Sequence, residues 1–223
     1  IFKIILMNTS KFTAVLLFLT AVVFGQQKIT VENVFSGTFR AKGMDELQSL
    51  KNTNQYTVLN VDQASRSMQI DLYDFATLKK VSNLVDTKNH KELADGIDSY
   101  TFDASEKKIL IACNSTKIFR HSFTADYYLY DIAAKSLIKL VDFQIQEPTF
   151  SPDGTKIAYA KENNLYVYDV ASKKSTPITT DGKKNAVING ITDWVYEEEF
   201  AFVRAFDWSK DSKKVAYIRF DES

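Results

Sequence analysis

Residues 197–199 are three consecutive glutamates, and no other stretch of this sequence has residue types and spacing so well suited to chemistry. Trp194 and Tyr196 precede them and the apolar run 200–203 follows, so we expect both flanks to be buried. Like charges that are held together raise one another's pKa unless a cation compensates them. The pattern therefore predicts a site for a positively charged group. The alternative is a solvated acidic loop or helix end, the usual state of a charge run.

Covalent catalysis is not predicted within this chain. None of its seven glycines frames a serine in the Gly-x-Ser-x-Gly elbow of an α/β-hydrolase. His121 lies beside Ser122, but adjacency in sequence is not the geometry of a catalytic triad, and we expect both to be polar strand residues. The single cysteine, Cys113, excludes an internal disulfide and is expected to be a small buried hydrophobe. With only two histidines, no metal site and no cofactor are expected.

The composition is that of an ordinary globular protein. Among 223 residues, 28 are Lys or Arg and 28 are Asp or Glu, so the net charge is zero. No long-range field therefore favours nucleic acid or an anionic membrane surface as a partner. Hydrophobic residues make up 45% of the chain, enough for a substantial core.

The N-terminal segment 1–25 has the pattern of a signal peptide, with the natural start expected at Met7. Lys11 supplies a positive charge, the run 12–24 is apolar, and Gly25 offers a small residue near a cleavage point before Gln26. A membrane anchor is the alternative, but about 13 apolar residues fall short of the ~20 that a spanning helix needs. We therefore expect an exported protein, periplasmic or secreted, with no membrane span in the mature chain.

Two domains follow in the mature chain. Residues 26–50 differ in pattern from the rest and are expected to be a lead-in segment, with a short helix or strand near residues 29–35. Residues 51–223 contain many short β-type runs separated by polar turns, which predicts an all-β domain.

Internal repeats decide the predicted architecture. Segments 101–112, 149–160 and 207–218 share one pattern: an aromatic residue, a polar turn, and then an apolar strand. The corresponding aromatics Phe102, Phe150 and Trp208 lie 48 and 58 residues apart.

A second repeated element is a Tyr-Asp pair that ends a strand. It occurs in segments 72–75, 129–132 and 167–170. Repeats of this length are typical of the four-stranded blades of a β-propeller, in which neighbouring blades stack to bury their faces. A β-sandwich is the alternative.

Two segments resemble the dipeptidyl peptidase IV family, which belongs to the prolyl oligopeptidase family of serine peptidases. Residues 189–200 resemble its double-glutamate motif, and this resemblance is highly specific. Residues 119–132 resemble the blade strand that carries a substrate-contacting arginine, although Phe119 stands where the family usually has tryptophan. The resemblance extends from about Ile29 to the end of the chain.

The resemblance implies a fold, an activity and site residues. The fold is an eight-bladed propeller that caps an α/β-hydrolase domain, of which this chain is expected to hold the N-terminal part only, with residues 26–50 packing near the hydrolase domain. The activity is the removal of N-terminal dipeptides, Xaa-Pro or Xaa-Ala, from peptides. Glu198 and Glu199 match the pair that grips the substrate ammonium, and Arg120 matches the arginine that reaches the carbonyl oxygen of its first peptide unit. Glu197 is assigned no contact. A homodimer of the full-length enzyme is a further expected partner arrangement.

The chemistry of a peptide N-terminus agrees with these roles. A protonated amino group offers three donors, and two carboxylates both balance its charge and accept its hydrogens. A fixed ammonium also fixes which peptide bond reaches a distant nucleophile. Two alternatives remain open: a non-enzymatic periplasmic β-propeller that binds peptides or proteins, and a related peptidase with a different preference at the cleaved bond.

Overall fold

The computed structural model describes residues 29–40 and 47–223, and the chain divides into two compact units, Ile1–Met44 and Asp45–Ser223. In the first unit, α2 (Val31–Phe35) begins where the Thr30 side chain accepts a hydrogen bond from the backbone N–H of Asn33. The short apolar run near residues 29–35 is therefore a helix rather than a strand. The predicted signal peptide, residues 1–25, lies outside the described residues. Within the described ranges, no helix is long and apolar enough to cross a membrane.

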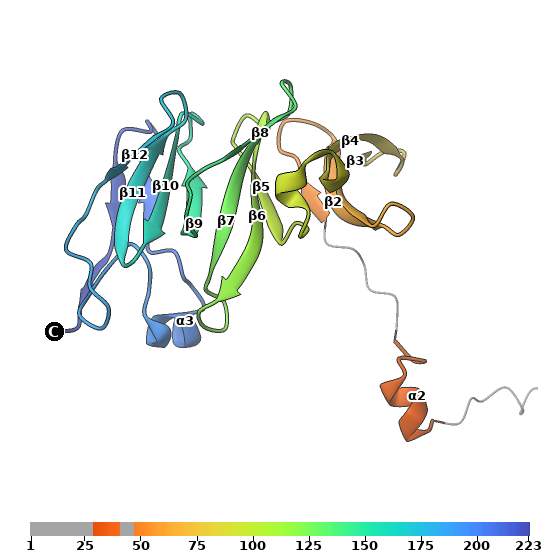
Figure 1. The fold of residues 1–223 in the computed structure, drawn as a ribbon, viewed down its shortest axis with the longest axis horizontal. Helices are drawn as coiled ribbons and strands as arrows, with labels where there is room; N and C mark the ends of the chain where they lie inside the picture. The colour runs from red at the N-terminus through yellow and green to blue at the C-terminus, as the bar shows by residue number, and fades with distance from the viewer. Residues whose placement is uncertain (1–28, 41–46) are drawn as a thin grey trace, which may run out of the picture. The chain divides into compact units, whose positions relative to one another are not determined.

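The second unit is built of four-stranded antiparallel sheets that stand side by side (Figure 1). Each of three sheets is a simple meander in chain order. The first contains β1 (Leu47–Ser49), β2 (Gln55–Asp62), β3 (Ser67–Asp74) and β4 (Lys80–Asp86). The second contains β5 (Ser99–Phe102), β6 (Lys108–Lys117), β7 (Phe123–Asp131) and β8 (Ser136–Lys139). The third contains β9 (Gln146–Phe150), β10 (Lys156–Lys161), β11 (Asn164–Asp169) and β12 (Lys174–Pro177).

Shorter elements complete the unit. Two 3₁₀ turns, η2 (Thr87–Asn89) and η3 (Lys91–Leu93), connect the first sheet to the second. After the third sheet, β13 (Val187–Asn189) pairs with β16 (Arg219–Asp221), and β14 (Phe206–Trp208) pairs with β15 (Val215–Tyr217). The helix α3 (Trp194–Phe200) lies between β13 and β14.

The sequence repeats correspond to these sheets, so the prediction of an all-β, propeller-type fold is confirmed. Phe102, Phe150 and Trp208 each end a strand, namely β5, β9 and β14, just before the polar turn. The repeated Tyr-Asp pairs end β3, β7 and β11, the third strand of each sheet. The second aromatic spacing is longer because β13 and α3 stand between β12 and β14. A total of eight blades stays a prediction. The first sheet begins at Leu47, inside the segment 26–50 that the sequence separates from the propeller.

Strand β6 shows how neighbouring sheets share their cores. Its odd-numbered residues Ile109, Ile111 and Cys113 pack in a cluster with Ile70 and Val85 of the first sheet. Its even-numbered residues Leu110 and Ala112 pack in another cluster with Ile157 and Tyr159 of the third sheet. Because successive side chains of a strand point to opposite faces, one strand supplies both clusters. This explains why residues 109–113 of β6 form a continuous apolar run, whereas the polar residues 114–117 are exposed.

Cys113 is the small buried hydrophobe that the sequence predicts. Its side chain is 1% exposed and its thiol is free. Burial raises the pKa of the Cys113 thiol to about 11. The thiol therefore stays protonated and unreactive near neutral pH.

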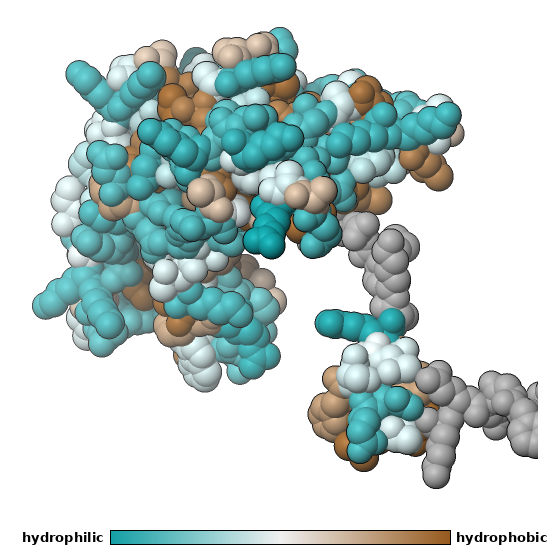
Figure 2. Space-filling model, turned by 45° about the vertical axis from the view of Figure 1, so that its right-hand side comes forward, coloured by the Kyte–Doolittle hydropathy of each residue, from teal (hydrophilic) through white to brown (hydrophobic). Residues whose placement is uncertain are grey.

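Many polar residues lie in the turns and outer strands, although Thr57 of β2 and Asp71 of β3 are buried. Hydrophilic side chains predominate on the face of this unit that Figure 2 shows, with small hydrophobic patches between them. The outermost strand β12 is exposed at all four positions and carries Lys174 and Pro177. Lysine and proline on an edge strand discourage pairing with another chain.

Candidate functional site

The segment that carries the three glutamates leaves the propeller and returns to it at one place. Ile191 and Arg204 form an antiparallel bridge there. The backbone N–H of Thr192 donates to the carbonyl oxygen of Val203 at 3.0 Å, and its hydroxyl donates to that of Phe202 at 2.9 Å. We call residues 192–203 the α3 excursion. Its two ends are held together, so the helix within it has a fixed base.

Helix α3 sends its three glutamates in different directions. Asp193 caps it by accepting the backbone N–H of Tyr196 at 2.8 Å, and Ala201 ends it in the left-handed conformation at φ 53°. In a helix with 3.6 residues per turn, consecutive side chains are about 100° apart. Glu197 is accordingly buried, Glu198 is half-buried and Glu199 is exposed.

The prediction that the apolar flanks of the glutamates are buried is wrong. Trp194 is 55% exposed and Phe200 is 65% exposed. Tyr196 is partly exposed, with its ring centroid 4.8 Å from that of Phe220. A helix of two turns has only one face to turn inward, and Glu197 occupies it.

Arg120 lies in a loop and not in a strand. Residues 118–122 join β6 to β7, and the N–H of Ile118 donates to the carbonyl oxygen of Ser122 at 2.9 Å to close this loop. The expectations of a blade strand for Arg120 and of strand positions for His121 and Ser122 are therefore corrected. We call residues 118–122 the arginine loop. Figure 1 shows α3 beside the end of the β6–β7 hairpin.

The structure brings Arg120 and Glu198 together. The Arg120 Nε lies 3.1 Å from Glu198 Oε2, with side-chain exposures of 70% and 18%. A largely exposed ion pair of this kind contributes about 0–1 kcal/mol to stability. Attraction between these two side chains is therefore too weak to hold the arginine loop against α3 by itself.

A stronger contact comes from Glu197. Its side chain is 0% exposed, and its Oε1 accepts the backbone N–H groups of His121 and, at 2.9 Å, Ser122. Hydrogen bonds to a charged group contribute about 1.5–3 kcal/mol each. Burial on its own raises the pKa of Glu197, but the hydrogen bonds from Ser122 and His121 outweigh it and leave that pKa below its usual range. The carboxylate is therefore ionised and joins α3 to the arginine loop.

Sequence reasoning missed this contact and assigned Glu197 no partner. One local signal was available, because Asp193 is a favourable N-cap and a helix beginning there separates Glu197 from Glu198 on its surface. The segment that Glu197 contacts is determined by how the blades stack, and blade stacking cannot be predicted from a local sequence pattern.

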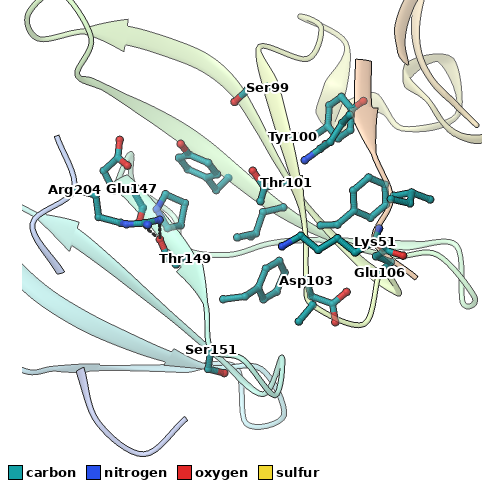
Figure 3. Close-up of a pocket in the computed structure, with 18 of the residues that line it drawn as sticks. Lys51, Ser99, Tyr100, Thr101, Asp103, Glu106, Glu147, Thr149, Ser151 and Arg204 are labelled. Carbon is teal, nitrogen blue, oxygen red and sulfur yellow. Dashed lines mark hydrogen bonds between the residues drawn. The ribbon is translucent and has the colours of Figure 1, made fainter. Parts of the chain in front are cut away.

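Two cavities lie near these elements. A groove of about 620 Å³ runs between the arginine loop and the start of α3, with Phe119, Ser122 and Trp194 in its wall. The other cavity, of about 480 Å³, is lined mainly by β1, β5 and β9. In Figure 3, Arg204 and Glu147 lie on one side of this second cavity, and Lys51 and Glu106 lie on the other.

Glu147 lies in an irregular part of β9. Its backbone has φ 51°, and the pairing of β9 with β10 shifts register there. Burial raises the pKa of the Glu147 carboxyl, nearby Arg204 opposes this, and Glu197 adds to it. The folded protein therefore favours the protonated form of Glu147 more than the unfolded chain does.

This shift predicts a pH-dependent gain from Glu147→Gln. A carboxyl with a raised pKa in the folded state contributes stability below its unfolded value of 4.5, and this is lost as the pH rises through the folded value. We expect Glu147→Gln to increase the free energy of unfolding at pH 8 relative to the parent protein, and to change it little at pH 4. Urea unfolding at both pH values measures this. An equal change at both would contradict the assignment.

Comparisons with known proteins agree with this architecture. A family model described as the dipeptidyl peptidase IV N-terminal region matches residues 103–223. Dipeptidyl peptidase 4 of Felis catus is 36% identical over 145 residues, which cover 64% of this chain and 19% of the cat protein. A relative from Mus musculus named prolyl endopeptidase FAP is 29% identical over 206 residues, covering 89% of this chain and 25% of the mouse protein.

A solved structure matches over most of the chain. The crystal structure of Porphyromonas gingivalis dipeptidyl peptidase 4 aligns with a TM-score of 0.79 and 32% identity, covering 89% of this chain and 28% of that one. This chain thus spans only a quarter or less of the cat and mouse relatives. From the family match over residues 103–223, together with this structural likeness, we conclude that the chain belongs to the dipeptidyl peptidase IV family, to whose N-terminal region it corresponds.

Proposed function

We propose that this chain is the substrate-gating propeller part of an exported serine exopeptidase that removes N-terminal dipeptides, Xaa-Pro or Xaa-Ala, from peptides. Glu198 and Glu199 bind the substrate ammonium, and Arg120 binds the carbonyl oxygen of its first peptide unit. The catalytic serine belongs to an α/β-hydrolase domain beyond this chain. Peptides with a free N-terminus are the substrates, and the protein acts in the periplasm or outside the cell.

The observation that carries this proposal is the 3.1 Å contact between Arg120 and Glu198. These residues come from different blades, and the family resemblance assigns both to one substrate. An arginine beside a carboxylate presents a donor for a carbonyl oxygen and an acceptor for an ammonium within a few ångströms of each other. The first residue of a peptide carries both an ammonium and a carbonyl oxygen, attached to the same Cα.

Length selection follows from this arrangement. If the ammonium and the first carbonyl are both held, the scissile bond lies at a fixed distance from the residues that bind them. A nucleophile held at that distance then reaches one peptide bond only. A peptide that lacks the ammonium loses charge-assisted hydrogen bonds of about 1.5–3 kcal/mol each. Each such loss lowers kcat/KM by about 10-fold or more, since 1.4 kcal/mol is a factor of ten.

The test compares free and blocked substrates. In the complete peptidase that contains this chain, we expect Ala-Pro-p-nitroanilide to be hydrolysed, and its N-acetylated form to have a kcat/KM lower by about 100-fold or more, for the loss of two such bonds. Equal kcat/KM values for the two substrates would contradict the proposed binding of the substrate ammonium. Such a result would favour an endopeptidase, the activity in the name of the mouse relative. If neither substrate were hydrolysed, the peptidase proposal itself would be wrong.

A further inference from the structure

Glu197 connects two segments that are far apart in the sequence, and each connection lies next to a proposed substrate-binding residue. On the arginine loop, its carboxylate accepts the N–H groups of His121 and Ser122, which directly follow Arg120. On α3, it directly precedes Glu198. One buried side chain thus sets the distance between the backbones that carry Arg120 and Glu198.

The other described contacts of these two segments do not provide this constraint. The Arg120 side chain is 70% exposed, and its contact with Glu198 is of the weak, solvent-screened kind. The hydrogen bonds at the base of the α3 excursion fix where it leaves the propeller, but they involve Thr192, Phe202 and Val203 rather than the arginine loop. Of the hydrogen bonds described for the arginine loop and α3, those that Glu197 accepts connect one segment to the other.

We infer that Glu197 is a positioning residue that holds the arginine loop against α3, so that Arg120 and Glu198 meet the substrate N-terminus in one fixed geometry. This inference rests on the proposed function of Arg120 and Glu198. Glu197 does not touch the substrate, because its side chain is fully buried. It acts through the two backbone N–H groups that it accepts.

A purely structural role would also explain a buried carboxylate, so the test must separate the two. A matched control is available in Asp103, which is 3% exposed and whose Oδ1 accepts the backbone N–H groups of Lys107 and Lys108, each at 2.8 Å. Asp103→Asn makes the same chemical change as Glu197→Gln, in the turn between β5 and β6. Both variants replace a charged acceptor by a neutral one of similar shape.

The experiment is a double-mutant cycle in the complete peptidase, measured with Ala-Pro-p-nitroanilide. A neutral acceptor makes hydrogen bonds roughly half as strong as a charged one, so we expect Glu197→Gln to lower kcat/KM by about three- to tenfold. In an Arg120→Ala background, the same change should lower kcat/KM by less than about twofold, because coupled residues are not additive. Asp103→Asn should lower the unfolding midpoint without changing kcat/KM in either background.

Each outcome has a definite meaning. If Arg120→Ala alone leaves kcat/KM unchanged, the proposed function is wrong, and this inference falls with it. If Arg120→Ala lowers kcat/KM but Glu197→Gln has no effect, or the same effect in both backgrounds, only the positioning role is overturned. If the Glu197→Gln variant does not fold, Glu197→Asp replaces it in the test, since it keeps the charge and shortens the side chain. Its effect on kcat/KM must likewise disappear in the Arg120→Ala background.

Discussion

Replacing Glu198 by alanine is expected to lower kcat/KM for dipeptidyl substrates with a free N-terminus by about 10- to 150-fold. The loss corresponds to one charge-assisted hydrogen bond of about 1.5–3 kcal/mol at a factor of ten for each 1.4 kcal/mol. Glu199→Ala is expected to have an effect of the same order. Steady-state kinetics with Ala-Pro-p-nitroanilide provide the measurement.

Folding should be almost unchanged by the same substitution. Glu198 is 18% exposed and its partner Arg120 is 70% exposed, so the arginine remains solvated when the carboxylate is removed. Glu92→Ala serves as a control, since Glu92 is an exposed glutamate in η3. Near-normal kinetics for Glu198→Ala, or an equal loss for Glu92→Ala, would remove Glu198 from the binding site.

Replacing Gly190 by alanine is expected to lower the free energy of unfolding by about 2–5 kcal/mol. Gly190 has φ 76°, where an L-residue carries strain of about 1–2 kcal/mol. A Cβ there would also lie 2.6 Å from the side chain of Leu165, which is fully buried. Overpacking of a core adds about 1–3 kcal/mol. Urea unfolding of the complete protein measures the sum.

Gly154→Ala separates the strain from the overlap. Gly154 has a similar φ of 69°, but the atom nearest to an added Cβ would be a carboxylate oxygen of Asp103, at 3.0 Å. We therefore expect the smaller loss there. If Gly154→Ala destabilised the protein as much as Gly190→Ala, the contact with Leu165 would not be the reason.

The blades could be predicted from the sequence because each of their signals is local. The aromatic residue, the polar turn and the following apolar strand all fall within about 12 residues, as in segment 149–160. Both faces of β6 are buried over residues 109–113, so this part of the strand appears as an uninterrupted apolar run. Repetition of this pattern specifies the architecture, since one blade cannot bury its faces alone.

The site could be predicted only in part. Arg120 and Glu198 were named from resemblance, and the structure brings them together, although Arg120 lies in a loop rather than a strand. The exposure of Trp194 and the burial of Glu197 were both missed. Hydrophobicity predicts burial on average, but in a helix as short as α3 the contact with the arginine loop decides which face turns inward.

The closed base of the α3 excursion has an evolutionary consequence. Because Ile191 and Arg204 pair with each other where the excursion begins and ends, the length of residues 192–203 can change without shifting the strands on either side. Exposed positions within it, such as Trp194 and Phe200, can therefore vary without endangering the scaffold. We expect divergence among related sequences to accumulate at such exposed positions first, while Glu197 and Glu198 are retained for their contacts with the arginine loop.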